Sequence, residues 1–379
     1  MTADKPISNK AKAEEWSPAH DFHIPSLDGV RAVAFSIVMV SHVPNLGRFP
    51  GGLGVTVFFF LSGFLITTLL RREFAKTGTI SIKSFYMRRV LRILPPMYLT
   101  LAFGVMCSLL GLWPGSPTPR GVLAEALHIT NYFLIARNDA EIVTGQRVYW
   151  SLAVEEHFYL AFPCLGLYML RRLRREQTLG LLACLCAGVL LWRGALVVWF
   201  EPSATRMQYA TDTRIDSILF GVIMALGFNP VLDEPRLVRP VAAAATFVAS
   251  LLGILITVVM PSFFFRETLR YTLQGLLLIP IFYVLITRPL WPVIRWLESP
   301  LLRYIGAVSY TLYLVHDSFF QAIHFHVPQL SRVGIAVIGL GVSFLYAAAM
   351  RKWVELPLLD WRRRFRARAP EPARAQIIS

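Results

Sequence analysis

The stretch covering residues 27–44 combines an apolar helix pattern with three ionisable side chains. Asp28 and Arg31 are three residues apart, close enough to form an ion pair on one helix face. His42 follows Arg31 by eleven residues, which places it about 16 Å farther along the axis and within roughly 20° of the same face. Histidine exchanges a proton near neutral pH, and this face is predicted to carry an ion pair near one end and an imidazole near the other. The alternative for His42 is an ordinary helix-end histidine at a membrane interface.

A second set of cations lies in the segment SIKSFYMRRVLRILPPMYL, residues 81–99. Arg89 and Arg92 are three residues apart on a predicted helix, a spacing that suits bidentate recognition of phosphate. Arg92 stands within the apolar run, so it must face something polar. For Arg88 and Lys83, ordinary anchoring at a cytoplasmic surface is the competing interpretation.

Carboxylates and hydroxyls gather in a third segment, YWSLAVEEHFYLAFP, residues 149–163. Glu155 and Glu156 are adjacent and therefore point about 100° apart, so only one of them can face the same side as Ser151 and Tyr159. One carboxylate is available to pair with an arginine and the other to position a base. The HExxH order of a zinc site is absent, as is any Cys/His ligand spacing, so no metal site is predicted.

Two further polar sets interrupt apolar stretches near the middle and the end of the chain. TDTRIDSILFG places Asp212 and Asp216 four residues apart, and SYTLYLVHDSFF contains Tyr313, His316 and Asp317. Each set alone is typical of hydrogen bonding between helices. Together, the five sets predict a shared polar chamber. Its expected lining residues are Asp28, Ser151, Tyr159, Asp216, Tyr313 and His316.

Composition identifies the class of protein that must position these residues. Of the 379 residues, 55% are hydrophobic and only 16% are charged, and the mean hydropathy is +0.53. The apolar residues occur in long continuous blocks, as in a polytopic helical membrane protein. This pattern excludes a soluble globular enzyme, a disordered chain and a small disulfide scaffold. Short alternating strands are also missing, which argues against an outer-membrane barrel.

The predicted fold is an all-α integral membrane bundle of about ten transmembrane helices. A helix needs about 20 apolar residues to cross a bilayer. The candidate spans are 27–44, 52–70, 90–113, 150–170, 178–200, 213–228, 240–260, 269–287, 301–321 and 332–350. Segment 121–135 is short and amphipathic, which predicts an interfacial or re-entrant helix. The pair Pro95–Pro96 predicts a helix break just after Arg92.

Lys and Arg residues in the loops decide the orientation. With the N-terminus inside, the loops assigned to the cytoplasm hold 26 Lys and Arg residues, and the outer loops hold 8. The positive-inside rule therefore predicts that both termini are cytoplasmic. This bias explains the net charge of +15 without a nucleic-acid partner. The basic segment 361–370 is predicted to contact lipid headgroups.

From about residue 24 to residue 360, the sequence resembles the membrane acyltransferase-3 family, bacterial O-acyltransferases of envelope glycans, exopolysaccharides, lipo-oligosaccharide signals and macrolides. The likeness is carried, in this order, by LDGVRAVAF…SHV with its R-x10-H spacing, GVTVFFFLSGFLIT, SFYMRRVLRILPPMY with its R-x-x-R pair, YWSLAVEEHFY, DTRIDSILFG and SYTLYLVH. One such string is weak evidence, whereas the ordered series is specific. It divides the chain into a polar N-terminal segment (1–26), an acyltransferase transmembrane domain (27–350) and a basic tail (351–379).

The resemblance implies a chemistry and a location. The donor would be acyl-CoA, most often acetyl-CoA, entering from the cytoplasm, and the acceptor a hydroxyl of a glycan, a lipid-linked saccharide or a similar molecule. No permanently bound cofactor is implied. The protein would lie in the bacterial inner membrane, with membrane lipids as further partners.

Residue roles follow from the same resemblance. The donor-binding residues would be Arg31, Arg89, Arg92, Arg88 and Lys83. His42 would act as the general base on the acceptor hydroxyl, and Glu155 or Glu156 would orient its imidazole or balance its charge. Direct transfer and a covalent acyl-histidine both remain open.

The competing function is transport or flipping of a glycan or lipid intermediate without acyl-transfer chemistry. A transporter of this kind would show inverted repeats with broken helices in corresponding halves, and the sequence shows no such repeat. A purely structural membrane subunit would leave the aligned Arg31 and His42 unexplained. The sequence predicts no oligomeric state.

Overall fold

The computed structural model describes residues 24–44, 49–137, 139–234, 239–287 and 292–367. These residues form helices and no strand, which confirms the all-α prediction. Each predicted span overlaps a long helix. The long helices are α1 (Pro25–His42), α2 (Gly51–Thr77), α3 (Ile82–Leu109), α6 (Tyr149–Arg172), α7 (Arg175–Trp199), α9 (Thr211–Gly227), α10 (Pro240–Val259), α12 (Leu269–Thr287), α14 (Pro300–His326) and α15 (Arg332–Met350).

Within the described ranges, six helices are long and apolar enough to cross a membrane. They are α2, α3, α7, α10, α12 and the continuous helix that runs from Arg332 to Trp361. The predicted count of about ten spans is therefore supported for six. The other long helices, α1, α6, α9 and α14, hold most of the ionisable residues singled out in the sequence, and these residues reduce the hydropathy of their helices. Helix α9 is also short, with 17 residues.

Short helices connect the long ones, and two of them correct a prediction. Residues 121–135 do not form one helix but two, α4 (Pro119–Ala126) and α5 (Thr130–Ala136). They are separated at His128, whose φ of 56° is left-handed and cannot continue a helix. The other short elements are η1 (Asp139–Glu141), η2 (Gln146–Val148), α8 (Ala204–Tyr209), α11 (Phe263–Glu267), α13 (Pro292–Leu297), the π-turn η3 (Arg351–Glu355) and α16 (Leu356–Ala367).

The break expected at Pro95–Pro96 is also absent, because α3 continues through both prolines to Leu109. Proline in a helix removes backbone hydrogen bonds and leaves carbonyls in the preceding turn without their usual partners. Near this point Tyr310 of α14 donates its hydroxyl hydrogen to the carbonyl of Ile93 at 2.9 Å. This contact joins α3 to α14 in the turn before the prolines.

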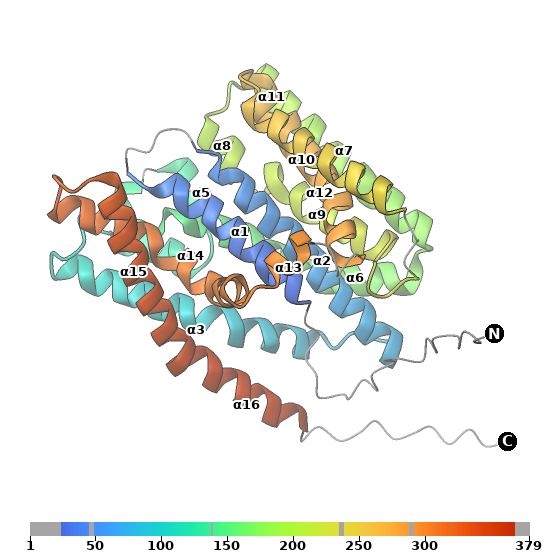
Figure 1. Cartoon of the computed structure of the whole chain (residues 1–379), viewed down its shortest axis with the longest axis horizontal. Coiled ribbons are helices and arrows are strands. Elements are labelled where there is room, and N and C mark those ends of the chain that lie inside the picture. Colours follow the sequence, from blue (N-terminus) through green and yellow to red (C-terminus); the bar gives the residue numbers. More distant parts are fainter. Residues whose placement is uncertain (1–23, 45–48, 138, 235–238, 288–291, 368–379) are drawn as a thin grey trace, which may run out of the picture.

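Helices α1 and α2 lie in the middle of the molecule (Figure 1). In that view α3, α14 and α15 lie on one side of them, and α7, α10 and α12 lie on the other. Two close approaches hold the centre together. A Cβ on Gly306 of α14 would lie 2.0 Å from the carbonyl oxygen of Asp28 in α1, and one on Gly221 of α9 would lie 2.0 Å from that of Phe60 in α2. Only glycine permits these backbones to touch, as at small-residue interfaces in membranes.

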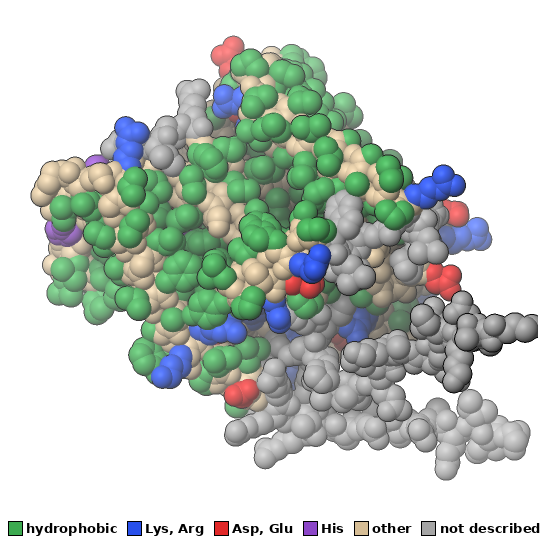
Figure 2. Space-filling model, in the orientation of Figure 1, with side chains coloured by type: hydrophobic (Ala, Val, Ile, Leu, Met, Phe, Trp, Pro, Cys, Tyr) green, Lys and Arg blue, Asp and Glu red, His purple; other side chains and the backbone are tan. Residues whose placement is uncertain are grey.

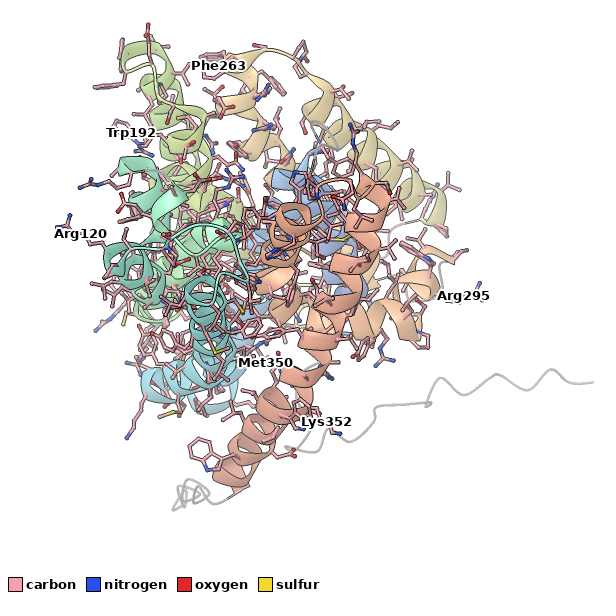
Figure 3. The ribbon with its side chains drawn as sticks, turned by 90° about the vertical axis from the view of Figure 1, so that its left-hand side faces the viewer. Arg120, Trp192, Phe263, Arg295, Met350 and Lys352 are labelled. Atoms are coloured by element: carbon pink, nitrogen blue, oxygen red, sulfur yellow. The ribbon has the colours of Figure 1, made fainter. Side chains whose placement is uncertain are left out.

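The outer surface is apolar. Figure 2 shows a broad hydrophobic surface with the charged side chains gathered mainly toward its edges. On the peripheral helices large side chains point away from the bundle; Leu191 of α7 is 73% exposed and Val259 of α10 is 66% exposed. In Figure 3, Phe263 and Lys352 lie toward opposite ends of the molecule. Apolar faces of this extent mark contact with lipid. Several loop cations used to predict the orientation, including Arg48, Arg236 and Arg288, and much of both chain ends, lie outside the described residues.

Candidate functional site

One group of cations, named the inner group after the side on which the sequence predicts it, is centred on Arg31, in the first half of α1. Its guanidinium lies 3.6 Å from the carboxylate of Asp28, which is the ion pair expected from their spacing. Arg31 also interacts electrostatically with Arg89 and Arg92 of α3. Three arginines from two helices therefore share one region, beside the carboxylate of Asp28. Arginines gathered in this way suit an anionic ligand.

Helix α6 supplies the groups that face Arg89. The Arg89 guanidinium lies over the ring of Tyr159, 5.3 Å from its centroid, and over the ring of Phe85, 5.8 Å from its centroid. It also interacts electrostatically with Glu155 and Glu156. The cation is thus held between aromatic faces and near two carboxylates.

A hydroxyl that the motif analysis did not single out completes this region. Ser62 of α2 donates a hydrogen bond to Glu155 Oε1 at 2.6 Å, and Tyr159 donates to the Ser62 hydroxyl at 3.2 Å. The hydroxyl links α2 to α6 and fixes one oxygen of Glu155. Its sequence signal was a polar residue inside the apolar run FFFLSGFLI.

The remaining predicted donor-binding cations lie differently. Arg88 forms an ion pair with Glu73 of α2 at 2.9 Å. Lys83 is exposed near the start of α3, and Arg92 is exposed although it interacts with Arg31. The structure therefore brings together Arg31, Arg89 and Arg92, and engages Arg88 in a separate pair.

A second group, named the outer group after the side on which the sequence predicts it, is centred on His42, the last residue of α1. Its Nδ1 lies 3.4 Å from Nε2 of His316 in α14, and the two rings meet edge to face with centroids 5.1 Å apart. His316 is completely buried, whereas His42 is half-buried. The neighbouring Asp317, also buried, interacts electrostatically with His42 and accepts a hydrogen bond from Gln321. The structure thus joins two histidines that are far apart in sequence.

Hydroxyl groups continue this outer group toward α6. The Tyr313 hydroxyl lies 2.6 Å from Ser151 Oγ, and both hydroxyls lie within hydrogen-bonding distance of the Val148 carbonyl. Tyr313 packs against His316, with ring centroids 5.9 Å apart. Of the predicted chamber residues, Ser151, Tyr313 and His316 therefore belong to one connected group.

The carboxylate expected beside His42 is in a different place. Glu155 is bonded to Ser62 and interacts with Arg89 and Arg31, so its contacts are with the inner group. The residue in direct contact with the His42 ring is His316, and the carboxylate that interacts with it is Asp317. The sequence pattern offered no distance information with which to choose between these carboxylates.

Asp216 likewise has a partner that the motif analysis did not identify. Its carboxylate receives hydrogen bonds from Arg193 of α7 at 2.8 and 3.1 Å, and both side chains are completely buried. Thr272 of α12 donates to the same carboxylate at 3.0 Å. This pair holds three helices together and belongs to neither group. The available signal was an arginine inside an apolar stretch, which requires a partner.

The two groups offer different chemistry at two levels of the same helix. Arg31 and His42 are eleven residues apart on α1, or about 16 Å along its axis. Cations at one level can hold phosphates, and an imidazole at the other can move a proton. Among the described residues, no cluster of three or more His, Cys, Asp or Glu side chains could hold a metal ion.

Comparison with known proteins identifies the family. The family model for an acyltransferase domain, Acyl_transf_3, matches residues 24–351. The peptidoglycan O-acetyltransferase OatA of Listeria monocytogenes is 29% identical over 363 residues, covering 89% of this chain and 56% of its own length. The O-acetyltransferase OatA of Staphylococcus aureus (strain NCTC 8325) is 27% identical over 353 residues, covering 89% and 57%.

A protein of Staphylococcus aureus (strain COL) named "Putative O-acetyltransferase" is 28% identical over 363 residues, covering 90% of this chain and 59% of its own length. The chain thus spans somewhat more than half the length of these curated relatives. No solved structure matches it. Because the family model covers most of the sequence, including both groups described above, the chain belongs to the acyltransferase-3 family.

Proposed function

We propose that this chain transfers an acyl group, with acetyl as the expected one, from cytoplasmic acyl-CoA to a hydroxyl of a glycan, lipid-linked saccharide or similar acceptor. The observation that carries the proposal is the separation of Arg31 and His42 along one helix, with cations at one level and an imidazole at the other. The relatives named O-acetyltransferases support the acetyl group, and one name that specifies peptidoglycan supports a glycan acceptor.

The donor site in this proposal is the inner group. CoA carries several phosphates at its nucleotide end, and Arg31, Arg89 and Arg92 offer the planar donors that bind them. Glu155 and Glu156 then act as counter-charges that hold Arg89 in place. The extended pantetheine arm covers the distance of about 16 Å to His42, so the thioester reaches the base while the nucleotide stays at the inner level.

The transfer step uses His42 as a general base. The acceptor oxygen forms a bond to the thioester carbonyl carbon and the carbon–sulfur bond breaks. The hydroxyl proton moves to His42 and from there to the leaving thiolate of CoA. With both termini cytoplasmic and ten spans, α1 runs outward, so His42 meets the acceptor from the outer side of the inner membrane.

The test is acceptor-dependent release of CoA by the full chain in lipid nanodiscs. Acetyl-CoA is supplied with isolated bacterial envelope glycan, and with a chito-oligosaccharide as a defined second acceptor. We expect free CoA and alkali-labile acetyl esters on the glycan to appear in equal amounts. Glycan that remains unacetylated with both acceptors, together with flipping of a lipid-linked glycan by the same vesicles, would replace this proposal with the transport function.

A further inference from the structure

The contact between His42 and His316 fixes where the protons of the two rings lie. Nδ1 of His316 faces two backbone carbonyl oxygens, those of Leu312 and Tyr313, each at 3.1 Å. A carbonyl oxygen only accepts hydrogen bonds, so Nδ1 of His316 must carry a hydrogen. The ring is completely buried, and a buried imidazole remains neutral with a single proton. Nε2 of His316 is therefore left as an acceptor.

The same reasoning applies to His42. Its Nδ1 lies 2.9 Å from the carbonyl oxygen of Val38 and 3.4 Å from the acceptor Nε2 of His316. The Ser41 hydroxyl lies 3.4 Å from the same Nδ1, but it donates its one hydrogen to the Val38 carbonyl, at the shorter distance of 2.6 Å. Every group around Nδ1 thus offers a lone pair, and His42 Nδ1 must carry the hydrogen. The lone pair of the neutral His42 ring is then on Nε2.

The His316 ring is itself held rigidly. Phe35 of α1 and Phe320 of α14 meet it edge to face, with centroid distances of 5.5 and 6.0 Å. Its Nδ1–H donates to two backbone carbonyls of its own helix, one turn earlier. Gly306, which lets α14 touch α1, lies on the same helix. Ring position and helix contact together keep Nε2 of His316 aimed at His42.

We propose that His316 is a positioning residue for the acyl transfer: it accepts a hydrogen bond from His42 Nδ1–H and so presents His42 Nε2 as the base. This inference rests on the proposed function. When Nε2 takes the acceptor's proton, the ring becomes an imidazolium whose Nδ1–H keeps both acceptors, Val38 and His316. The proton then leaves from Nε2 to the thiolate of CoA, so His316 itself gains and loses no proton.

Asp317 is the carboxyl group of this arrangement. It follows His316 directly, is buried, and interacts electrostatically with His42. A neutral imidazole thus orients the base, and an imidazolium formed at His42 favours the ionised form of the Asp317 carboxyl beside it. Serine hydrolases combine these two duties in one aspartate.

Two substitutions distinguish the role of His316 as a hydrogen-bond acceptor from its role as a buried ring that packs between helices. His316→Phe keeps a ring among Phe35 and Phe320 but removes the acceptor. His316→Gln places an amide oxygen near the position of Nε2 and so restores a hydrogen-bond acceptor for His42. The matched control is His326→Phe, because His326 lies at the end of the same helix and its Nε2 lies 2.9 Å from the Leu112 carbonyl rather than near His42.

The assay follows CoA release from acetyl-CoA with isolated envelope glycan, using the full chain in nanodiscs. We expect His316→Phe to lower kcat on the order of 10- to 100-fold while the KM for acetyl-CoA stays within about twofold. His316→Gln should recover most of the loss and His326→Phe should be unchanged. A folded His316→Phe protein with the parent kcat, or folded Phe and Gln variants that are equally impaired, would overturn the proposal.

A measurement that needs no acceptor separates this inference from the proposed function. Nitrogen NMR of histidine-labelled protein distinguishes protonated from unprotonated ring nitrogens, and the His42 signals are identified by their loss in His42→Ala. We expect neutral His42 to be protonated at Nδ1 in the parent protein and to exchange between both tautomers in His316→Phe. Protonation of parent His42 at Nε2 would overturn the positioning role even if the protein transfers acetyl groups.

Discussion

Arg193 lies 2.8 Å from Asp216 although both side chains are completely buried between helices. Removing one partner leaves a charge without compensation in a low-dielectric interior. We therefore expect Arg193→Met or Asp216→Asn to destabilise the fold by about 3–5 kcal/mol. Heating the protein in nanodiscs and measuring the remaining folded fraction by size-exclusion chromatography checks this.

The double variant Arg193→Leu with Asp216→Leu is the matched control. It removes both charges, so the uncompensated charge disappears and most of the lost stability should return. If each single variant melts at the parent temperature, the pair has no structural importance. If the double variant is no better than the singles, packing rather than charge explains the loss.

Arg89→Ala and Arg92→Ala should weaken donor binding more than they slow the chemical step. Their proposed contacts are to CoA phosphates, remote from the reacting carbon, so the KM for acetyl-CoA should rise by about tenfold or more while kcat changes little. Lysine should replace either arginine poorly, because the contact is bidentate.

Arg171→Ala serves as the control for these two variants, since Arg171 donates a hydrogen bond to the Thr79 hydroxyl, at 2.8 Å, and lies outside the inner group. Steady-state kinetics in nanodiscs provide the measurement. An unchanged KM in both Arg89→Ala and Arg92→Ala would return these arginines to a role in membrane anchoring.

The orientation predicts which exposed positions a membrane-impermeant thiol reagent reaches. Phe49, 43% exposed before α2, should lie outside, and Lys76, exposed near the end of α2, should lie inside. In a background without the four native cysteines, Phe49→Cys should be labelled in intact cells and Lys76→Cys only after permeabilisation. The reverse pattern would contradict the positive-inside assignment and the direction of transfer.

Asp233, in the loop after α9, gives a pH-dependent contribution to stability. Burial alone would raise the pKa of this carboxyl, but hydrogen bonds from Arg71 and from the Asn229 backbone outweigh it and hold the pKa below its usual range. A lowered folded pKa stabilises the fold at pH values above the unfolded pKa of about 3.9. This contribution is lost as the pH falls through the folded pKa.

The measurable consequence is a difference between the parent and Asp233→Asn. Because the pair is 22% and 30% exposed, we expect a difference of about 1 kcal/mol at pH 7. Melting temperatures measured at a series of pH values should converge as the pH drops below about 4. A difference that stays constant down to that range would exclude the Arg71–Asp233 charge interaction as its cause.

The helices of this fold could be predicted from local pattern, whereas several contacts could not. Apolar blocks are a property of neighbouring residues, so each predicted span overlaps a helix. The break at His128 depends on a left-handed backbone that composition does not reveal, and α3 passes through Pro95–Pro96 with the Tyr310 hydroxyl on a nearby carbonyl. Neither the end of α4 before His128 nor the continuation of α3 through the prolines follows from the local composition.

In the candidate site, too, local contacts could be predicted from the sequence and long-range contacts could not. The Asp28–Arg31 pair and the shared face of Arg31 and His42 follow from helix spacing alone. The contact of His42 with His316 joins residues 274 positions apart, and no spacing rule reaches that far. Arg193 could have been found, because the cost of a charge inside an apolar helix already demanded a partner for it.

The most direct measurement is the kcat of acceptor-dependent CoA release by His42→Ala in nanodiscs, compared with His326→Ala as a matched histidine on the far end of α14. If His42 removes the acceptor proton, we predict that kcat falls by about 100-fold or more while the KM for acetyl-CoA stays within about twofold. His326→Ala should match the parent. A folded, inserted His42→Ala protein that releases CoA and acetylates glycan at close to the parent rate would contradict the assignment of His42 as the base.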